Sequence, residues 1–105
     1  MISVEHLCGQ ITIKGHADYA PKGEDIVCEA VSALTQTYVC SLEHLTDDKV
    51  KYSLSPGYAC ISDPHSPEGF LLTQSFLLGL DLLAHAYPEH IHIENLGLYM
   101  NRPEC

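Results

Sequence analysis

The sequence predicts an α+β fold, a two-layer sandwich with a mainly antiparallel sheet and two helices on one face. Two pairs of short segments carry apolar residues at every second position, as expected for strands with one buried face. Each pair is joined by a glycine-containing turn and is followed by a longer segment with helical periodicity. The predicted order is therefore β-β-α-β-β-α, with a possible short C-terminal strand.

The size and composition of the chain predict one globular domain spanning residues 1–105. Of its 105 residues, 46% are apolar and 18% are charged. The net charge of −9 argues against direct nucleic-acid binding, which requires a surface rich in lysine and arginine. The charge suits a basic partner, although acidity also keeps cytosolic proteins soluble.

The cysteine pattern predicts neither a zinc site nor a disulfide framework, because the five cysteines are widely spaced and odd in number: Cys8, Cys28, Cys40, Cys60 and Cys105. Cys40 and Cys60 are expected to be buried and inert. We expect a reducing, cytoplasmic compartment and no metal or other cofactor. Residues 1–7 lack the apolar run of a secretory signal, and polar side chains interrupt residues 70–86, so no membrane contact is expected.

The first half of the chain predicts a hairpin, a loop and a helix. Strands are expected at residues 2–7 and 11–14, and the proline and glycine of residues 17–23 predict a loop. The helix is expected from about Asp25, an N-cap residue type, to Leu45. Its core face is predicted from helical spacing: Val27, Val31, Leu34, Tyr38, Leu42 and Leu45.

The second half repeats this pattern. Strands are expected at residues 50–54 and 58–61, joined by a Ser-Pro-Gly turn. A second helix is expected from Pro67 to about Ala86, with a serine as its cap, and a short strand at residues 90–93 follows.

The second helix carries apolar side chains around most of its circumference. A helix on one face of a monomer's sheet should have a wide polar side, and a domain of this size has no room for a fully interior helix. We therefore expect a second copy of the chain to cover the helix, which predicts a homodimer.

Residues 15–34 contain the pattern that points to chemistry. His16 is expected at the end of a strand and Cys28 in the first turn of the next helix. The unpaired amides of a helix N-terminus favour a thiolate, and a nearby imidazole can accept the thiol proton and later protonate a leaving amine. Free backbone amides near residues 26–28 are expected to hold an oxyanion. The pattern is compatible with nucleophilic catalysis, but spacing alone does not establish it, since a lone cysteine on an amphipathic helix is usually a small buried hydrophobic residue and a lone histidine at a strand end is usually structural or exposed.

Two further side chains are expected near Cys28. Ser32 lies one helical turn further along, on the same side of the helix. Asp25 could cap the helix or orient His16, whereas a bare carboxylate beside the thiol would oppose its ionisation.

Three runs of residues lie in a fixed order in this segment: GHA at 15–17, G-x-D-I-V-C at 23–28 and AVSAL at 30–34. Together they resemble the ribosomal-processing cysteine protease family called Prp. The likeness extends to the chain length, the opening hairpin and the leucine-rich helix followed by Tyr-Pro-Glu.

The resemblance implies an endopeptidase that removes the N-terminal extension of the large-subunit ribosomal protein L twenty-seven. His16 and Cys28 match the family's catalytic pair, and Asp25 and Ser32 match its motif aspartate and serine. The partner would be the N-terminal peptide of that ribosomal protein, and the fold would be a dimeric α+β sandwich.

The resemblance also implies that the loop at residues 17–23 orders over the substrate, with Gly15 and Gly23 as its hinges. Glu29 departs from the small residues common in the family and changes the charge near the site. The family cleaves after aromatic residues, so an apolar cleft should flank the pair. Three aromatic residues could line that cleft or simply pack in the core or the loop: Tyr19, Tyr38 and Phe70.

Two other functions are compatible with the sequence. His90-x-His92 would place two imidazoles on one strand face, but no spaced third or fourth metal ligand accompanies them. A non-enzymatic ribosome-assembly or interaction protein would suit the acidity and the apolar helix equally well. Replacement of Cys28 by alanine separates these functions, because binding should survive the change and proteolysis should not.

Overall fold

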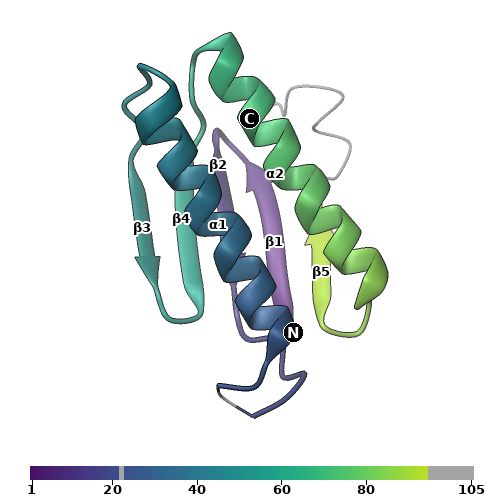
Figure 1. The fold of residues 1–105 in the computed structure, drawn as a ribbon. Helices are drawn as coiled ribbons and strands as arrows, with labels where there is room; N and C mark the ends of the chain where they lie inside the picture. The colour runs from purple at the N-terminus through teal and green to yellow at the C-terminus, as the bar shows by residue number, and fades with distance from the viewer. Residues whose placement is uncertain (22, 95–105) are drawn as a thin grey trace.

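A computed structural model describes residues 1–21 and 23–94, so Cys105 falls outside the described residues. Two helices lie side by side on one face of a five-stranded sheet (Figure 1). In chain order the elements are β1 (Ile2–Leu7), β2 (Gln10–Lys14), α1 (Ile26–Leu45), β3 (Tyr52–Ser55), β4 (Tyr58–Ser62), α2 (Pro67–Ala86) and β5 (Ile91–Glu94). The predicted α+β class, the element order and the short final strand are confirmed.

The strands lie in the order β3-β4-β2-β1-β5. Three of the four pairings are antiparallel, and β5 lies parallel to β1 after α2 has crossed back over the sheet. Ser3 of β1 pairs with Lys14 of β2 on one side and with His92 of β5 on the other. The end of β2 and the start of β5 therefore meet at one end of the sheet.

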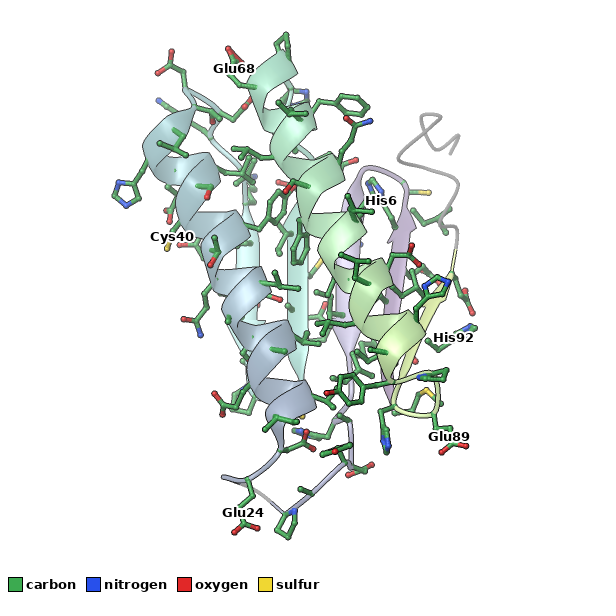
Figure 2. The ribbon with its side chains drawn as sticks, turned by 45° about the vertical axis from the view of Figure 1, so that its right-hand side comes forward. His6, Glu24, Cys40, Glu68, Glu89 and His92 are labelled. Atoms are coloured by element: carbon green, nitrogen blue, oxygen red, sulfur yellow. The ribbon has the colours of Figure 1, made fainter. Side chains whose placement is uncertain are left out.

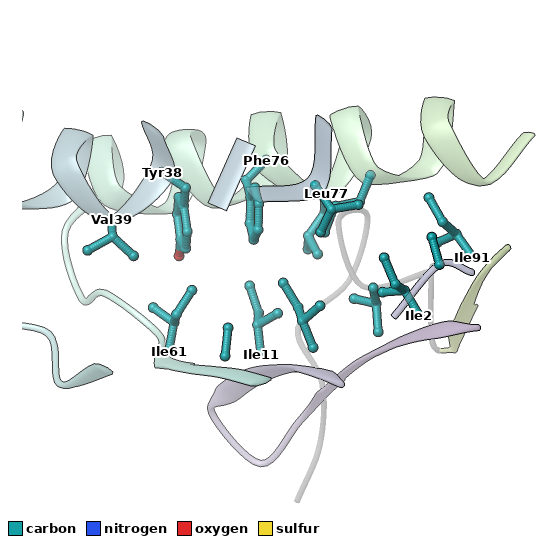
Figure 3. Close-up of a cluster of buried hydrophobic side chains, with 14 of the residues drawn as sticks. Ile2, Ile11, Tyr38, Val39, Ile61, Phe76, Leu77 and Ile91 are labelled. Carbon is teal, nitrogen blue, oxygen red and sulfur yellow. The ribbon is translucent and has the colours of Figure 1, made fainter. Parts of the chain in front are cut away.

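The core fills the space between the two helices and the sheet (Figure 3). Alternate residues of the central strands point into it, as the period of two predicts, and each fully buried aliphatic side chain contributes about 1.5–3 kcal/mol. Tyr38 of α1 stacks on Phe76 of α2 with ring centroids 4.5 Å apart. The Tyr38 hydroxyl lies 2.7 Å from Thr73 Oγ1, so the buried polar group is satisfied.

Two predicted burials on α1 are wrong. Leu45 is 68% exposed. Its angle on the helix matches the core face, but it lies in the last turn, and a side chain is buried only where another element packs opposite it. Cys40 is exposed as well, on the outer side of α1 (Figure 2). It lies two residues before the buried Leu42, which is about 200° around the helix. Cys60 is only half-buried.

The apolar circumference of α2 is divided between the core and the surface. Phe76, Leu77 and Leu80 are buried, whereas Leu78 and Leu82 are 51% and 65% exposed. Among the residues described, α2 is long and apolar enough to cross a membrane by length and composition. Its polar side chains alone therefore do not exclude a membrane span. In this fold its buried side forms one wall of the core.

Candidate active site

Cys28 occupies the first turn of α1, as predicted, and is half-buried. Its Sγ atom accepts a hydrogen bond from the backbone N–H of Ala17, with 3.3 Å between nitrogen and sulfur. Ala17 lies in the loop that follows β2, so the sulfur is contacted from a segment outside its own helix.

Asp25 is the N-cap of α1 and also holds the preceding loop. Its Oδ1 accepts from the N–H groups of Val27 and Cys28, each at 3.0 Å, and its Oδ2 accepts from Tyr19 at 3.0 Å. The hydrogen bond from Cys28 lowers the pKa of the buried Asp25 carboxyl, with further lowering from the loop amides against the opposing effect of burial. Of the two predicted roles, the structure therefore shows the cap.

This cap overturns one expectation about the helix N-terminus. The N–H groups of Val27 and Cys28 were expected to be free for an oxyanion, but the Asp25 carboxylate accepts from both. The physical reason is that a buried N-cap carboxylate satisfies the same unpaired amides that would otherwise bind an anion.

His16 follows β2 and lies above the turn between β3 and β4. A Cβ atom at Gly57 would come within 2.7 Å of His16 Nε2, so the imidazole lies directly over this glycine. Gly15 has a φ of 99° and packs against the Met1 carbonyl, which leaves no room for a side chain. The amino group of Met1 donates to the His16 carbonyl at 2.6 Å. The backbone of the histidine is thus held by the N-terminal residue Met1, while its imidazole is exposed.

The two predicted catalytic side chains line one pocket of about 490 Å³ between α1 and the β3–β4 hairpin. In the described part of the chain, the side chains of His16 and Cys28 are not joined by a hydrogen bond. Ser32, Gly15 and Glu29 line the same pocket. Two other predicted site residues do not line the pocket. Asp25 is the N-cap of the helix that carries Cys28, and Gly23 lies in the loop with a φ of 91°.

The apolar part of the pocket comes from residues that the sequence analysis did not single out. The hairpin supplies Leu54, Pro56, Tyr58 and Ala59, and the central strands supply Ile2 and Ile13. The three aromatic residues considered for this role are absent from the lining: Tyr19, Tyr38 and Phe70. Strand alternation in the third predicted strand placed its apolar residues on one face but could not show what that face meets.

The histidine pair considered as a metal site is engaged otherwise. His90 Nδ1 lies 2.8 Å from the Ala17 carbonyl oxygen. His92 Nε2 lies 3.6 Å from Glu94 Oε1, on the outer side of β5 (Figure 2). In the part of the chain that the structure describes, no three His, Cys, Asp or Glu side chains gather to hold a metal ion.

Comparisons with known proteins agree with this geometry. The family model for cysteine protease Prp matches residues 1–92. The ribosomal processing cysteine protease Prp of Mycoplasma genitalium is 33% identical, covering 89% of this chain and 94% of that protein. The Staphylococcus aureus protein of the same name is 30% identical, with coverages of 79% and 82%.

Solved structures show the same fold. The Staphylococcus aureus protease Prp in complex with a covalently linked product peptide superposes with a TM-score of 0.84 at 26% identity, covering 90% of this chain and 98% of that one. Its complex with a substrate peptide gives a TM-score of 0.76 at 25% identity, with the same coverages. The chain described here therefore belongs to the Prp family of ribosomal-processing cysteine proteases and is a cysteine peptidase.

Proposed function

We propose that Cys28 is the nucleophile of this peptidase and that His16 is its general base and acid. The observation that carries the proposal is that both side chains line one pocket, with the Ala17 N–H already donating to the Cys28 sulfur. The covalently linked product peptide in the Staphylococcus aureus relative supports a covalent route.

The proposed reaction is acyl transfer in two steps. His16 takes the thiol proton, and the Cys28 thiolate attacks the carbonyl carbon of the scissile peptide bond. As the C–N bond breaks, His16 gives that proton to the leaving nitrogen, and a thioester on Cys28 remains. His16 then accepts a proton from water as the water oxygen attacks the thioester. The C–S bond breaks, His16 returns its proton to the Cys28 sulfur, and the product leaves as a carboxylate once its remaining proton has passed to solvent.

The proposed substrate is the N-terminal extension of the ribosomal protein L twenty-seven, cleaved in the cytoplasm. The apolar side of the pocket suits the aromatic residues that the resemblance implies at the cleavage junction. The net charge of −9 and Glu29 at the pocket favour a basic chain on the other side of the cut.

The test uses two cysteines of the same helix. A synthetic peptide that spans the extension junction is incubated with the wild-type protein, Cys28→Ala and Cys40→Ala, and products are identified by mass spectrometry. Cys28→Ala should lose activity on the order of 10⁴-fold or more, since the nucleophile is gone. Cys40→Ala, on the exposed side of α1, should cleave at the wild-type rate. Cleavage by Cys28→Ala would refute the proposal.

The proposal includes a homodimer formed through α2. Leu71, Leu78 and Leu82 follow one stripe of the helix and are 66%, 51% and 65% exposed. An apolar stripe of this kind is typical of a surface that a second copy covers.

Sedimentation of a Leu78→Asp, Leu82→Asp double variant tests this part of the proposal. The variant should sediment as a monomer and the wild-type protein as a dimer. Leu45→Asp, which changes an equally exposed leucine at the end of α1, should leave the dimer intact. A monomeric wild-type protein would contradict this part.

A further inference from the structure

The backbone of Ala17 is held on both sides of its Cα atom. Its N–H donates to Cys28 Sγ at 3.3 Å, and its carbonyl oxygen lies 2.8 Å from His90 Nδ1. A carbonyl oxygen can only accept, so the imidazole donates from Nδ1. Ala17 is 1% exposed, so water has little access to its backbone as an alternative hydrogen-bond partner. The residue next to the proposed base thus links the proposed nucleophile to a histidine 73 positions away.

The backbone of His90 is fixed to the sheet. Its N–H donates to the Tyr87 carbonyl at 3.0 Å, and its carbonyl accepts from the N–H of Ile2 at 2.8 Å. The first bond lies within the tight connection between α2 and β5, and the second joins that connection to β1. Figure 2 shows the connection at the same end of the molecule as the loop that contains Glu24. The imidazole therefore extends from a rigid support toward a loop.

Tyr19 strengthens the same contact. Its ring lies edge-on to His90 with centroids 5.3 Å apart, and edge-on to Tyr87 at 5.5 Å. The Tyr19 N–H donates to Asp25, so the loop is tied to α1 by its backbone and to the α2–β5 connection by its side chain. The His16–Ala17 peptide, which carries the N–H, is held by the Met1 amino group at the His16 carbonyl. The hydrogen bond from His90 holds the next peptide, on the carbonyl side of the Ala17 Cα atom.

We propose that His90 is a positioning residue that fixes the carbonyl side of Ala17 and thereby helps to hold the N–H of the same residue on the Cys28 sulfur. The role matters because a hydrogen bond to a thiolate depends on direction, and a backbone N–H that is free to turn would lose it. The inference rests on the proposed role of Cys28 as nucleophile. It gives a function to a histidine that touches neither the substrate pocket nor the sulfur.

The test measures how fast Cys28 reacts with iodoacetamide at pH 7, relative to the exposed Cys40 in the same molecule. In His90→Phe, which keeps a ring against Tyr19 but removes the donor, the Cys28-to-Cys40 rate ratio should fall about tenfold. The value of kcat for the junction peptide should fall by a similar factor, with KM unchanged. His90→Asn, whose amide can donate from nearly the same place, should recover most of both.

The controls separate positioning from folding and from the proposed function. His92→Phe, two residues along the same segment, should leave the rate ratio and kcat unchanged, and thermal melting should show every variant folded. A wild-type or higher rate ratio in a folded His90→Phe variant overturns the inference. Cleavage by Cys28→Ala would instead refute the proposed function, and the alkylation ratio would still report on His90 because it needs no substrate.

Discussion

The two helices of this protein start in similar ways and end up with different roles. Each has 20 residues, lies on the same face of the sheet and begins with a side-chain cap. In α2 the Ser66 hydroxyl accepts from the Gly69 N–H at 2.9 Å, and Asp48 binds the Ser66 hydroxyl and the His65 N–H. In α1 the cap carboxylate of Asp25 accepts from the first turn in the same manner.

The difference lies in what else each cap contacts. The cap of α1 reaches back to the Tyr19 N–H and so fixes the loop that brings Ala17 to the Cys28 sulfur. The cap of α2 holds the connection that follows β4, and the first turn of α2 contains no cysteine. A capped helix N-terminus is therefore not a catalytic site by itself. The first turn of α1 differs because a second segment of the chain is fastened over the cysteine that we propose as the nucleophile.

The largest expected effect distinguishes the two caps. Asp25→Ala should lower kcat/KM for the junction peptide by about 10²-fold or more, because the loop is released and the Ala17 N–H is displaced from the sulfur. Ser66→Ala should cost about 1 kcal/mol of stability and leave the activity unchanged. Steady-state kinetics and urea unfolding of both variants measure these quantities. Equal losses of activity in the two folded variants would contradict the comparison.

Substitutions at two turn glycines test whether activity depends on the position of the His16 imidazole. Gly57 and Gly9 have φ angles of 72° and 80°, so alanine strains both backbones similarly. At Gly57 the new Cβ would meet His16 Nε2 at 2.7 Å, whereas at Gly9 nothing lies within 4 Å. Gly57→Ala should therefore lose roughly tenfold or more in kcat/KM, as expected for a misplaced catalytic group. Gly9→Ala should lose stability alone, and a comparable loss of activity there would assign the effect to strain.

The smallest expected effect concerns pH. Hydrogen bonds from Cys28 and the loop amides lower the pKa of Asp25, and a hydrogen bond from the Ser66 side chain lowers that of Asp48. A carboxyl with a folded-state pKa below its unfolded value stabilises the fold above the unfolded pKa of about 3.9. That contribution disappears as the pH falls through the folded-state value.

Urea midpoints of Asp25→Asn and Asp48→Asn, compared with the wild type, measure this effect. Each variant should differ most from the wild type at pH 6–7, and the difference should shrink as the pH falls from about 4 through the folded-state pKa. Only Asp25→Asn should also lower the peptidase activity at pH 7. Differences that do not change with pH would show that the two carboxylates stabilise the fold in another way.

The helices were predictable because their signals are local. Apolar spacing, the caps and Pro67 predict α1 to Leu45 and α2 to Ala86, as the structure shows. The strand order was not predictable, because the parallel pairing of β5 with β1 depends on how α2 crosses the sheet. The exposure of Cys40 was predictable, because its angle on the helix places it on the side of α1 away from the buried Leu42.

The candidate site divides in the same way. The placement of His16, Cys28 and Ser32 around one pocket follows from a strand end and a helix start that are close in sequence. The His90 contact and the apolar hairpin wall involve residues far along the chain, and they became visible only once the fold had brought them together. The sequence did offer Asp25 as an N-cap, and a cap carboxylate occupies the same amides that were expected to hold an oxyanion.

The most direct test is to trap the acyl-enzyme. The protein is mixed with the junction peptide, quenched in acid within the first turnover and digested for peptide mapping by mass spectrometry. The mass of the N-terminal cleavage product, joined as a thioester, should appear on the peptide that contains Cys28 and vanish in Cys28→Ala. An adduct on any other cysteine, or continued cleavage by Cys28→Ala, would contradict the account.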